Sequence, residues 1–194
     1  ILPRRCGYWD IIASLNHKRL YMNITKNIVL IGLSGSGKTA FSKRLSERYG
    51  LPVVDMDSEI VKKAGKSIND IFAEQGEEAF RQMETECALE CGKLTGTIIS
   101  TGGGVVLREE NMLALKQNGL VIFLDRLPED ILGEDLSDRP LVADDNKKIY
   151  RLREQRYPLY IRYADTVVRN CKAKEDTEAA IVAALEKLIS EQPK

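Results

Sequence analysis

The chain is poor in the residues that most often build metal centres. His17 is its only histidine, and its four cysteines are Cys6, Cys87, Cys91 and Cys171. No pair has the C-x-x-C spacing of a structural zinc site. Cys87 and Cys91 stand four apart among apolar residues of a predicted helix, so we interpret them as buried reduced thiols. Reduced thiols are typical of a cytoplasmic protein, which is the location we expect.

An excess of charge and long apolar runs are also missing. The 29 basic and 29 acidic side chains give a formal net charge of zero, which provides no electrostatic basis for binding nucleic acid or an anionic membrane. No apolar stretch approaches the ~20 residues that span a bilayer. The 194 residues, 43% of them hydrophobic, indicate a globular protein with one domain. We expect a monomer.

What the sequence does contain is the octapeptide GLSGSGKT, which follows an apolar run and precedes an amphipathic stretch. It has the G-x-x-x-x-G-K-[ST] pattern of a P-loop. Its glycines let the backbone turn tightly and aim N–H groups at phosphates, beside the start of a helix. Lysine adds positive charge and threonine a hydroxyl for Mg²⁺. The pattern predicts ATP contacts from Gly35, Ser36, Gly37, Lys38, Thr39 and Ala40.

The rest of the chain alternates between strand and helix patterns, which predicts a doubly wound parallel α/β sheet. Strands are expected at 28–31, 51–54, 97–100, 120–124 and 166–168. Helices are expected at 38–49, 68–72, 76–94, 108–118, 146–163 and 177–189. The stretch 129–145 is polar and loop-like, as a lid would be.

Two aspartates mark a candidate second pocket. Asp55 and Asp57 end a predicted strand, and in an extended chain both would point to the same side. Ligands of open α/β sheets bind at that end of the strands. One carboxylate could serve Mg²⁺ while the other accepts a proton from a substrate hydroxyl. A turn followed by a helix N-cap explains the pair equally well.

Arginines and glycines add to this pocket. Arg81 and Glu84 form either a surface ion pair or an arginine aimed at an anion. The triplet Gly102–Gly104 follows a strand, which indicates that another group approaches the backbone closely. Arg139 lies in the polar stretch, where it is either an ordinary solvated residue or a lid residue that caps the phosphates and excludes water.

The ordered motifs resemble those of the shikimate kinase family. They are GLSGSGKT at 32–39, DMD at 55–57, FRxxE at 80–84, STGGG at 100–104, RPL at 139–141 and R-x-PLY at 156–160. The resemblance covers about residues 26–170. It implies a three-layer α/β/α fold with a five-stranded parallel sheet, a substrate-binding region at about 55–94 and a lid at about 129–145. The implied reaction is ATP-dependent phosphorylation of the 3-hydroxyl of shikimate, a step toward chorismate and the aromatic amino acids.

The resemblance also implies residue roles. Asp57 would orient or deprotonate the attacking hydroxyl. The shikimate carboxylate would be held by Arg81, braced by Glu84, and by Arg156, with Gly102 and Gly103 near the ring. The phosphates would contact Lys38 and Arg139, and Mg²⁺ would contact Thr39 and, through water, Asp55. One departure is the acidic stretch 130–138, which has no lysine or arginine where many relatives carry a basic residue near the adenine.

Two other functions compete with this reading. Another small-molecule P-loop kinase, such as a gluconate or nucleoside monophosphate kinase, would also need arginines and carboxylates, although the GGG and RPL motifs favour shikimate. A nucleotide-binding regulatory module could dispense with Asp57 and Arg139. A GTPase is disfavoured because the chain has no N-K-x-D tetrapeptide.

The first 21 residues differ from the rest. They hold the only tryptophan and the only histidine and do not begin with methionine. We expect Met22 to be the natural start, residues 1–21 to be an extension, and residues 22–194 to form a single P-loop kinase domain.

Overall fold

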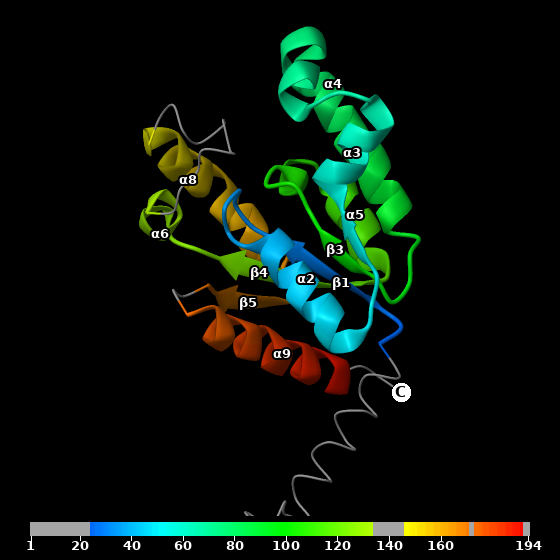
Figure 1. The fold of residues 1–194 in the computed structure, drawn as a ribbon, viewed down its shortest axis with the longest axis vertical. Coiled ribbons are helices and arrows are strands. Elements are labelled where there is room, and N and C mark those ends of the chain that lie inside the picture. Colours follow the sequence, from blue (N-terminus) through cyan, green and yellow to red (C-terminus); the bar gives the residue numbers. More distant parts are fainter. Residues whose placement is uncertain (1–23, 134–145, 171–172, 192–194) are drawn as a thin grey trace, which may run out of the picture.

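The computed structural model describes residues 24–133, 146–170 and 173–191, which form a parallel sheet between two layers of helices (Figure 1). Its strands are β1 (Asn27–Ile31), β2 (Val53–Asp55), β3 (Ile98–Ser100), β4 (Gly119–Asp125) and β5 (Thr166–Arg169). They make one five-stranded sheet in the order β2-β3-β1-β4-β5, with every neighbouring pair parallel. The α/β class and the three-layer, five-stranded architecture are therefore confirmed.

The central strand β1 supplies both hydrophobic cores because successive side chains of a strand point to opposite faces. Ile28 and Leu30 pack on the face covered by α2 (Lys38–Tyr49) and α9 (Lys174–Ser190). Val29 and Ile31 pack on the other face. That face is covered by α3 (Met56–Ala64), α4 (Ile68–Cys91), α5 (Glu109–Gln117) and α8 (Asn146–Tyr163).

Helix α4 contains a break at Gly76, where φ is 82° and ψ is 172°. The two helices predicted at 68–72 and 76–94 are therefore two segments of one element. Ser67 caps its start by accepting a hydrogen bond from the Asp70 backbone N–H, as its position before the apolar stretch predicts. Cys87 and Cys91 are buried free thiols, as predicted, with their Sγ atoms 4.0 Å apart.

The structure corrects two local predictions. The polar stretch 129–145 was expected to be a loop, but it begins within helix α6 (Pro128–Leu132), which starts with a proline at its first position and buries Ile131 completely. Asp57 was expected to continue an extended strand, but α3 begins at Met56 and Asp57 lies in its first turn. Asp55 is the N-cap, accepting from the Ser58 N–H at 3.1 Å.

Residues Val105–Leu107 form a short 3-10 turn, η1, that the sequence did not predict. Among the described residues, no helix is both long and apolar enough to cross a membrane. Residues 1–21 and Arg139, together with most of the expected lid, lie outside the described residues.

Candidate active site

The P-loop occupies the turn between β1 and α2. Gly35 and Gly37 have φ values of 87° and 96°, a region that side chains with a Cβ rarely adopt. Helix α2 begins directly after Gly37, with Thr39 and Ala40 exposed in its first turn. The buried Lys38 Nζ donates to the carbonyls of Gly32 at 2.9 Å and Leu33 at 2.8 Å. The loop thus holds its ammonium group beside the N-terminus of α2, the arrangement that binds phosphate.

Residues distant in sequence support this loop. The Arg126 Nη1 donates to the Gly35 carbonyl at 3.1 Å, and the Asn170 Nδ2 donates to the Ser36 carbonyl at 2.8 Å. Thr177 in turn donates to the Asn170 side chain at 3.2 Å. These contacts connect the P-loop to the residues that directly follow β4 and β5. Sequence reasoning missed all three residues because they belong to no local motif.

Thr39 and Asp55, the predicted metal residues, lie together although they belong to different elements. The Thr39 hydroxyl donates to Asp55 Oδ2 at 3.0 Å and lies 3.4 Å from the Ser100 hydroxyl. Hydroxyl and carboxylate oxygens are donors that suit Mg²⁺, which usually takes one or two carboxylates and completes its shell with phosphate and water. Thr39 and Asp55 supply one hydroxyl and one carboxylate, a donor set that fits this pattern.

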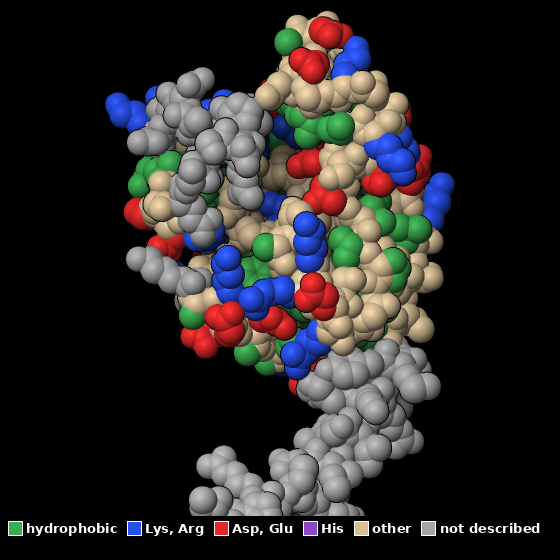
Figure 2. Space-filling model, viewed as in Figure 1, with side chains coloured by type: hydrophobic (Ala, Val, Ile, Leu, Met, Phe, Trp, Pro, Cys, Tyr) green, Lys and Arg blue, Asp and Glu red, His purple; other side chains and the backbone are tan. Residues whose placement is uncertain are grey.

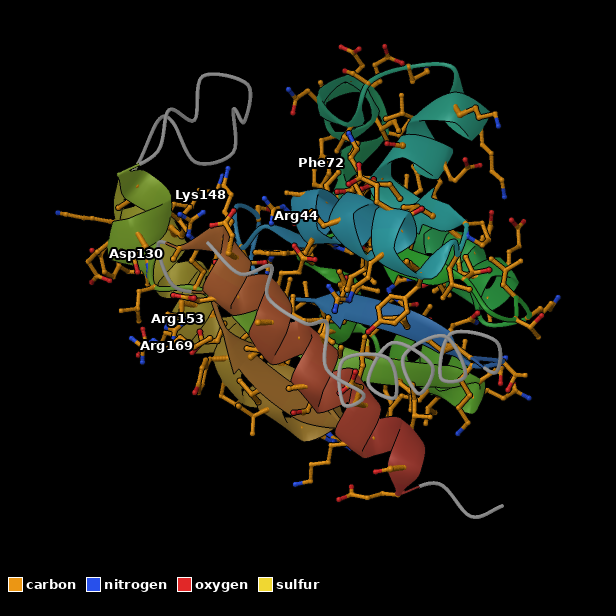
Figure 3. The ribbon with its side chains drawn as sticks, turned by 60° about the horizontal axis from the view of Figure 1, so that its bottom comes forward. Arg44, Phe72, Asp130, Lys148, Arg153 and Arg169 are labelled. Atoms are coloured by element: carbon orange, nitrogen blue, oxygen red, sulfur yellow. The ribbon has the colours of Figure 1, made fainter. Side chains whose placement is uncertain are left out.

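Beside the P-loop lies a cavity of about 330 Å³, within the usual size range of small-molecule sites. Figure 2 shows this face of the molecule hollowed, with acidic and basic side chains along the hollow. The cavity is lined by the predicted residues Asp57, Arg81, Glu84, Gly102, Gly103 and Arg156. Sequence reasoning missed Phe72, Glu77, Leu107, Lys148, Leu152 and Gln155, which also line it; Phe72 on α4 and Lys148 on α8 are labelled in Figure 3.

Arg81 is held by two carboxylates of its own helix. Its Nη1 donates to Glu84 Oε2 at 2.6 Å, and its Nη2 and Nε donate to Glu77 Oε1 at 3.1 and 3.3 Å. The Arg81 side chain is 11% exposed and that of Glu84 only 1%. The pair is therefore not the surface ion pair that the sequence left open, but a buried one at the wall of the cavity.

The glycine triplet brings backbone against these charged groups. A Cβ on Gly102 would lie 2.7 Å from Asp57 Oδ1 and 2.8 Å from Glu84 Oε1. A Cβ on Gly104 would collide with the Arg81 guanidinium. The predicted close approach is therefore confirmed, and its partners are the charged side chains of the cavity.

Burial dominates the electrostatics of the two acidic residues. It raises the pKa of Asp57 above its ordinary value; Lys38 and Arg81 oppose this shift, and Asp55 adds to it. Burial likewise raises the pKa of Glu84, against the opposing effect of Arg81. A carboxylate with a raised pKa is a better proton acceptor once ionised, which suits a general base.

Arg156 and Tyr160 form the α8 side of the cavity. Arg156 Nε is buried and has no hydrogen-bond partner among the described residues, so it has donor capacity to offer a ligand. The Tyr160 hydroxyl donates to the Gly103 carbonyl at 2.5 Å and so fixes α8 against the glycine triplet. Burial raises the pKa of this hydroxyl, so it remains a donor.

Arg153, one turn before Arg156, has a different role. Its Nη1 donates to Asp125 Oδ1 at 2.5 Å, and its guanidinium stacks on the Tyr157 ring 4.6 Å away. Figure 3 shows Arg153 on the side of the molecule that also carries Asp130 and Arg169. The ion pair joins α8 to the end of β4 and so helps to place Arg156.

A phosphate-binding loop beside a cavity lined by arginines and carboxylates is typical of a small-molecule P-loop kinase. The family model described as shikimate kinase matches residues 34–188. A shikimate kinase from Symbiobacterium thermophilum is 41% identical over 168 residues, covering 84% of this chain and 95% of that protein. The chain belongs to the shikimate kinase family.

Solved structures agree. Shikimate kinase from Acinetobacter baumannii, in complex with shikimate, superposes with a TM-score of 0.80 at 30% identity, covering 92% of this chain and 99% of that one. Shikimate kinase from Aquifex aeolicus superposes with a TM-score of 0.72 at 33% identity, covering 86% and 99%.

Proposed function

We propose that the protein transfers the γ-phosphoryl group of ATP to the 3-hydroxyl of shikimate, giving shikimate 3-phosphate and ADP on the route to chorismate and the aromatic amino acids. Family membership supports this assignment. The observation that carries it is Ser34, a P-loop residue that also lines the cavity containing Asp57, Arg81 and Arg156. A donor phosphate held by the loop thus has an acceptor pocket adjoining it.

On the donor side, backbone N–H groups from Gly35 to Ala40 would hold the phosphates, and Lys38 would leave its carbonyl partners to contact them. Mg²⁺ held by Thr39 and, through water, by Asp55 would neutralise charge on the phosphates. Because phosphoryl transfer needs mainly alignment and charge neutralisation, these groups suffice for the donor half.

On the acceptor side, Asp57 would accept the proton of the 3-hydroxyl and orient the ring. Arg81 and Arg156 would hold the carboxylate, because guanidinium groups bind carboxylates with paired hydrogen bonds that an ammonium cannot match. Glu84, fixed and buried, would brace Arg81. The backbone of Gly102 and Gly103 would lie near the ring.

The remaining assignments concern the wider chain. Arg139 would cap the transferring phosphate when the lid closes, and residues 22–194 would act as one domain, since every described strand pairs in a single sheet. The protein would be a cytoplasmic monomer, and the buried free thiols of Cys87 and Cys91 agree with that location.

The test is an ADP-release assay with purified protein, ATP, Mg²⁺ and one acceptor at a time. We expect turnover with shikimate and little with gluconate or nucleoside monophosphates. Folded protein that releases no ADP with shikimate would contradict the proposal, and turnover with gluconate instead would identify the rival sugar-acid kinase.

A further inference from the structure

Arg81 pairs with two carboxylates, although one would balance the charge of its guanidinium. Glu84 accepts from Nη1, while Glu77 accepts from both Nη2 and Nε. The Nη2–Nε edge is one of the two edges through which a guanidinium binds a carboxylate with paired hydrogen bonds. A carboxylate therefore already occupies an edge of Arg81 at the wall of the cavity.

The two carboxylates differ in how easily they can leave. The Glu84 side chain is 1% exposed, whereas that of Glu77 is 63% exposed. Moving Glu77 into water costs little, because an exposed ion pair contributes only weakly to stability. Moving Glu84 away from Arg81 would break the buried ion pair and leave a charge in the protein interior without that partner. Of the two, only Glu77 can readily yield its place.

We propose that Glu77 occupies the edge of Arg81 to which the substrate carboxylate binds. It orients Arg81 before the substrate is bound and is displaced when the acceptor binds. The inference rests on the proposed function, because it assigns to Arg81 the carboxylate of an anionic acceptor. Glu77 is a positioning residue. It competes with the substrate carboxylate and so lowers the affinity for it, but it also holds the Arg81 guanidinium in an orientation that can bind a carboxylate.

The surrounding charges support this exchange. Three acidic residues, Asp57, Glu77 and Glu84, line the cavity together with Arg81, Lys148 and Arg156. With Glu77 in place the formal charges balance, so an arriving carboxylate adds an uncompensated negative charge. Displacing Glu77 from the cavity wall toward solvent removes that imbalance.

The experiment compares Glu77→Gln with Glu74→Gln. Glu74 is the matched control because it lies on the same helix, is 58% exposed and pairs with Lys66 outside the cavity. Steady-state assays measure KM and kcat for shikimate and for its methyl ester, which keeps the ring and hydroxyls but has no anion. The wild-type assay comes first, so failure of the proposed function appears as absence of shikimate turnover before any variant is compared.

For Glu77→Gln we expect the shikimate KM to fall about two- to fivefold, the size of an exposed ion pair, with a smaller change in kcat. The ester KM should stay unchanged, and Glu74→Gln should change neither. An unchanged or raised shikimate KM in Glu77→Gln overturns the inference, as does an equal fall for the ester, since neither reflects competition for Arg81.

Discussion

The Arg81 Nη1 lies 2.6 Å from Glu84 Oε2, and the carboxylate of this pair is buried almost completely. Removing Glu84 would leave the largely buried Arg81 with only the exposed Glu77 carboxylate as its partner among the described residues, and breaking a buried pair in this way is destabilising. The pair therefore shapes both the stability of α4 and the geometry of the cavity.

Glu84→Ala should lower the free energy of unfolding by roughly 3 kcal/mol, because Arg81 loses its buried partner. Chemical denaturation measures this value. Glu74→Ala, which breaks the exposed pair with Lys66, should cost less than about 1 kcal/mol. Equal losses of unfolding free energy in the two variants would show that burial does not determine how much the Arg81–Glu84 pair contributes to stability.

Asp57→Asn should lower kcat by about 10²- to 10⁴-fold, the usual contribution of a general base. ATP affinity should change little, because the phosphates are assigned to the P-loop and not to Asp57. Steady-state kinetics and nucleotide titration measure the two quantities. If both fall by the same factor, Asp57 serves the nucleotide and not the acceptor hydroxyl.

The raised pKa of Asp57 has a consequence for stability against pH. Because its pKa is higher in the folded than in the unfolded protein, the folded state binds the proton more tightly. The contribution of this group to stability is therefore fully present below the unfolded pKa and is lost as pH rises through the folded pKa.

Replacing Asp57 with asparagine removes this titration. Asp57→Asn should therefore be more stable than wild type at pH 7. The difference in unfolding free energy should shrink as the pH falls through the raised folded pKa of Asp57 and should level off below the ordinary aspartate pKa. Urea denaturation at several pH values measures it. A variant that is less stable than wild type at pH 7 would show that ionised Asp57 stabilises the fold through Lys38 and Arg81.

Gly102→Ala should lower kcat/KM for shikimate by about 10²-fold, the scale expected when a catalytic group is misplaced by about 1 Å. The added Cβ would lie within 2.8 Å of both the Asp57 and Glu84 carboxylates. Gly133→Ala is the control for an added methyl group, because its Cβ would meet nothing closer than 3.4 Å. Wild-type activity in Gly102→Ala would mean that the Asp57 and Glu84 side chains can shift without loss of activity.

Much of this architecture could be predicted from local patterns. The P-loop, the sheet class and the Ser67 cap follow from glycine spacing, apolar periodicity and capping chemistry. Asp57 lines the cavity, as expected, but the structural reason given for it was wrong. Asp55 ends β2 and caps helix α3, and Asp57 lies in the first turn of that helix.

What could not be predicted depends on contacts between distant segments. Glu77 and Lys148 are exposed charged residues that a sequence cannot distinguish from solvated ones; the cavity forms only when α4 and α8 lie on the same face of the sheet. Arg126 and Asn170 support the P-loop from positions far along the chain. Their roles follow from tertiary packing rather than from any motif.

The most direct test of the proposed reaction is the position of the transferred phosphate. The protein is incubated with ATP, Mg²⁺ and shikimate, and phosphorus–proton correlation NMR of the isolated product identifies the phosphorylated carbon. If the 3-hydroxyl is the acceptor, the phosphorus couples to the proton on C3 and to no other ring proton. Coupling to a different ring proton, or formation of ADP with inorganic phosphate and no phosphorylated shikimate, would contradict the proposed reaction.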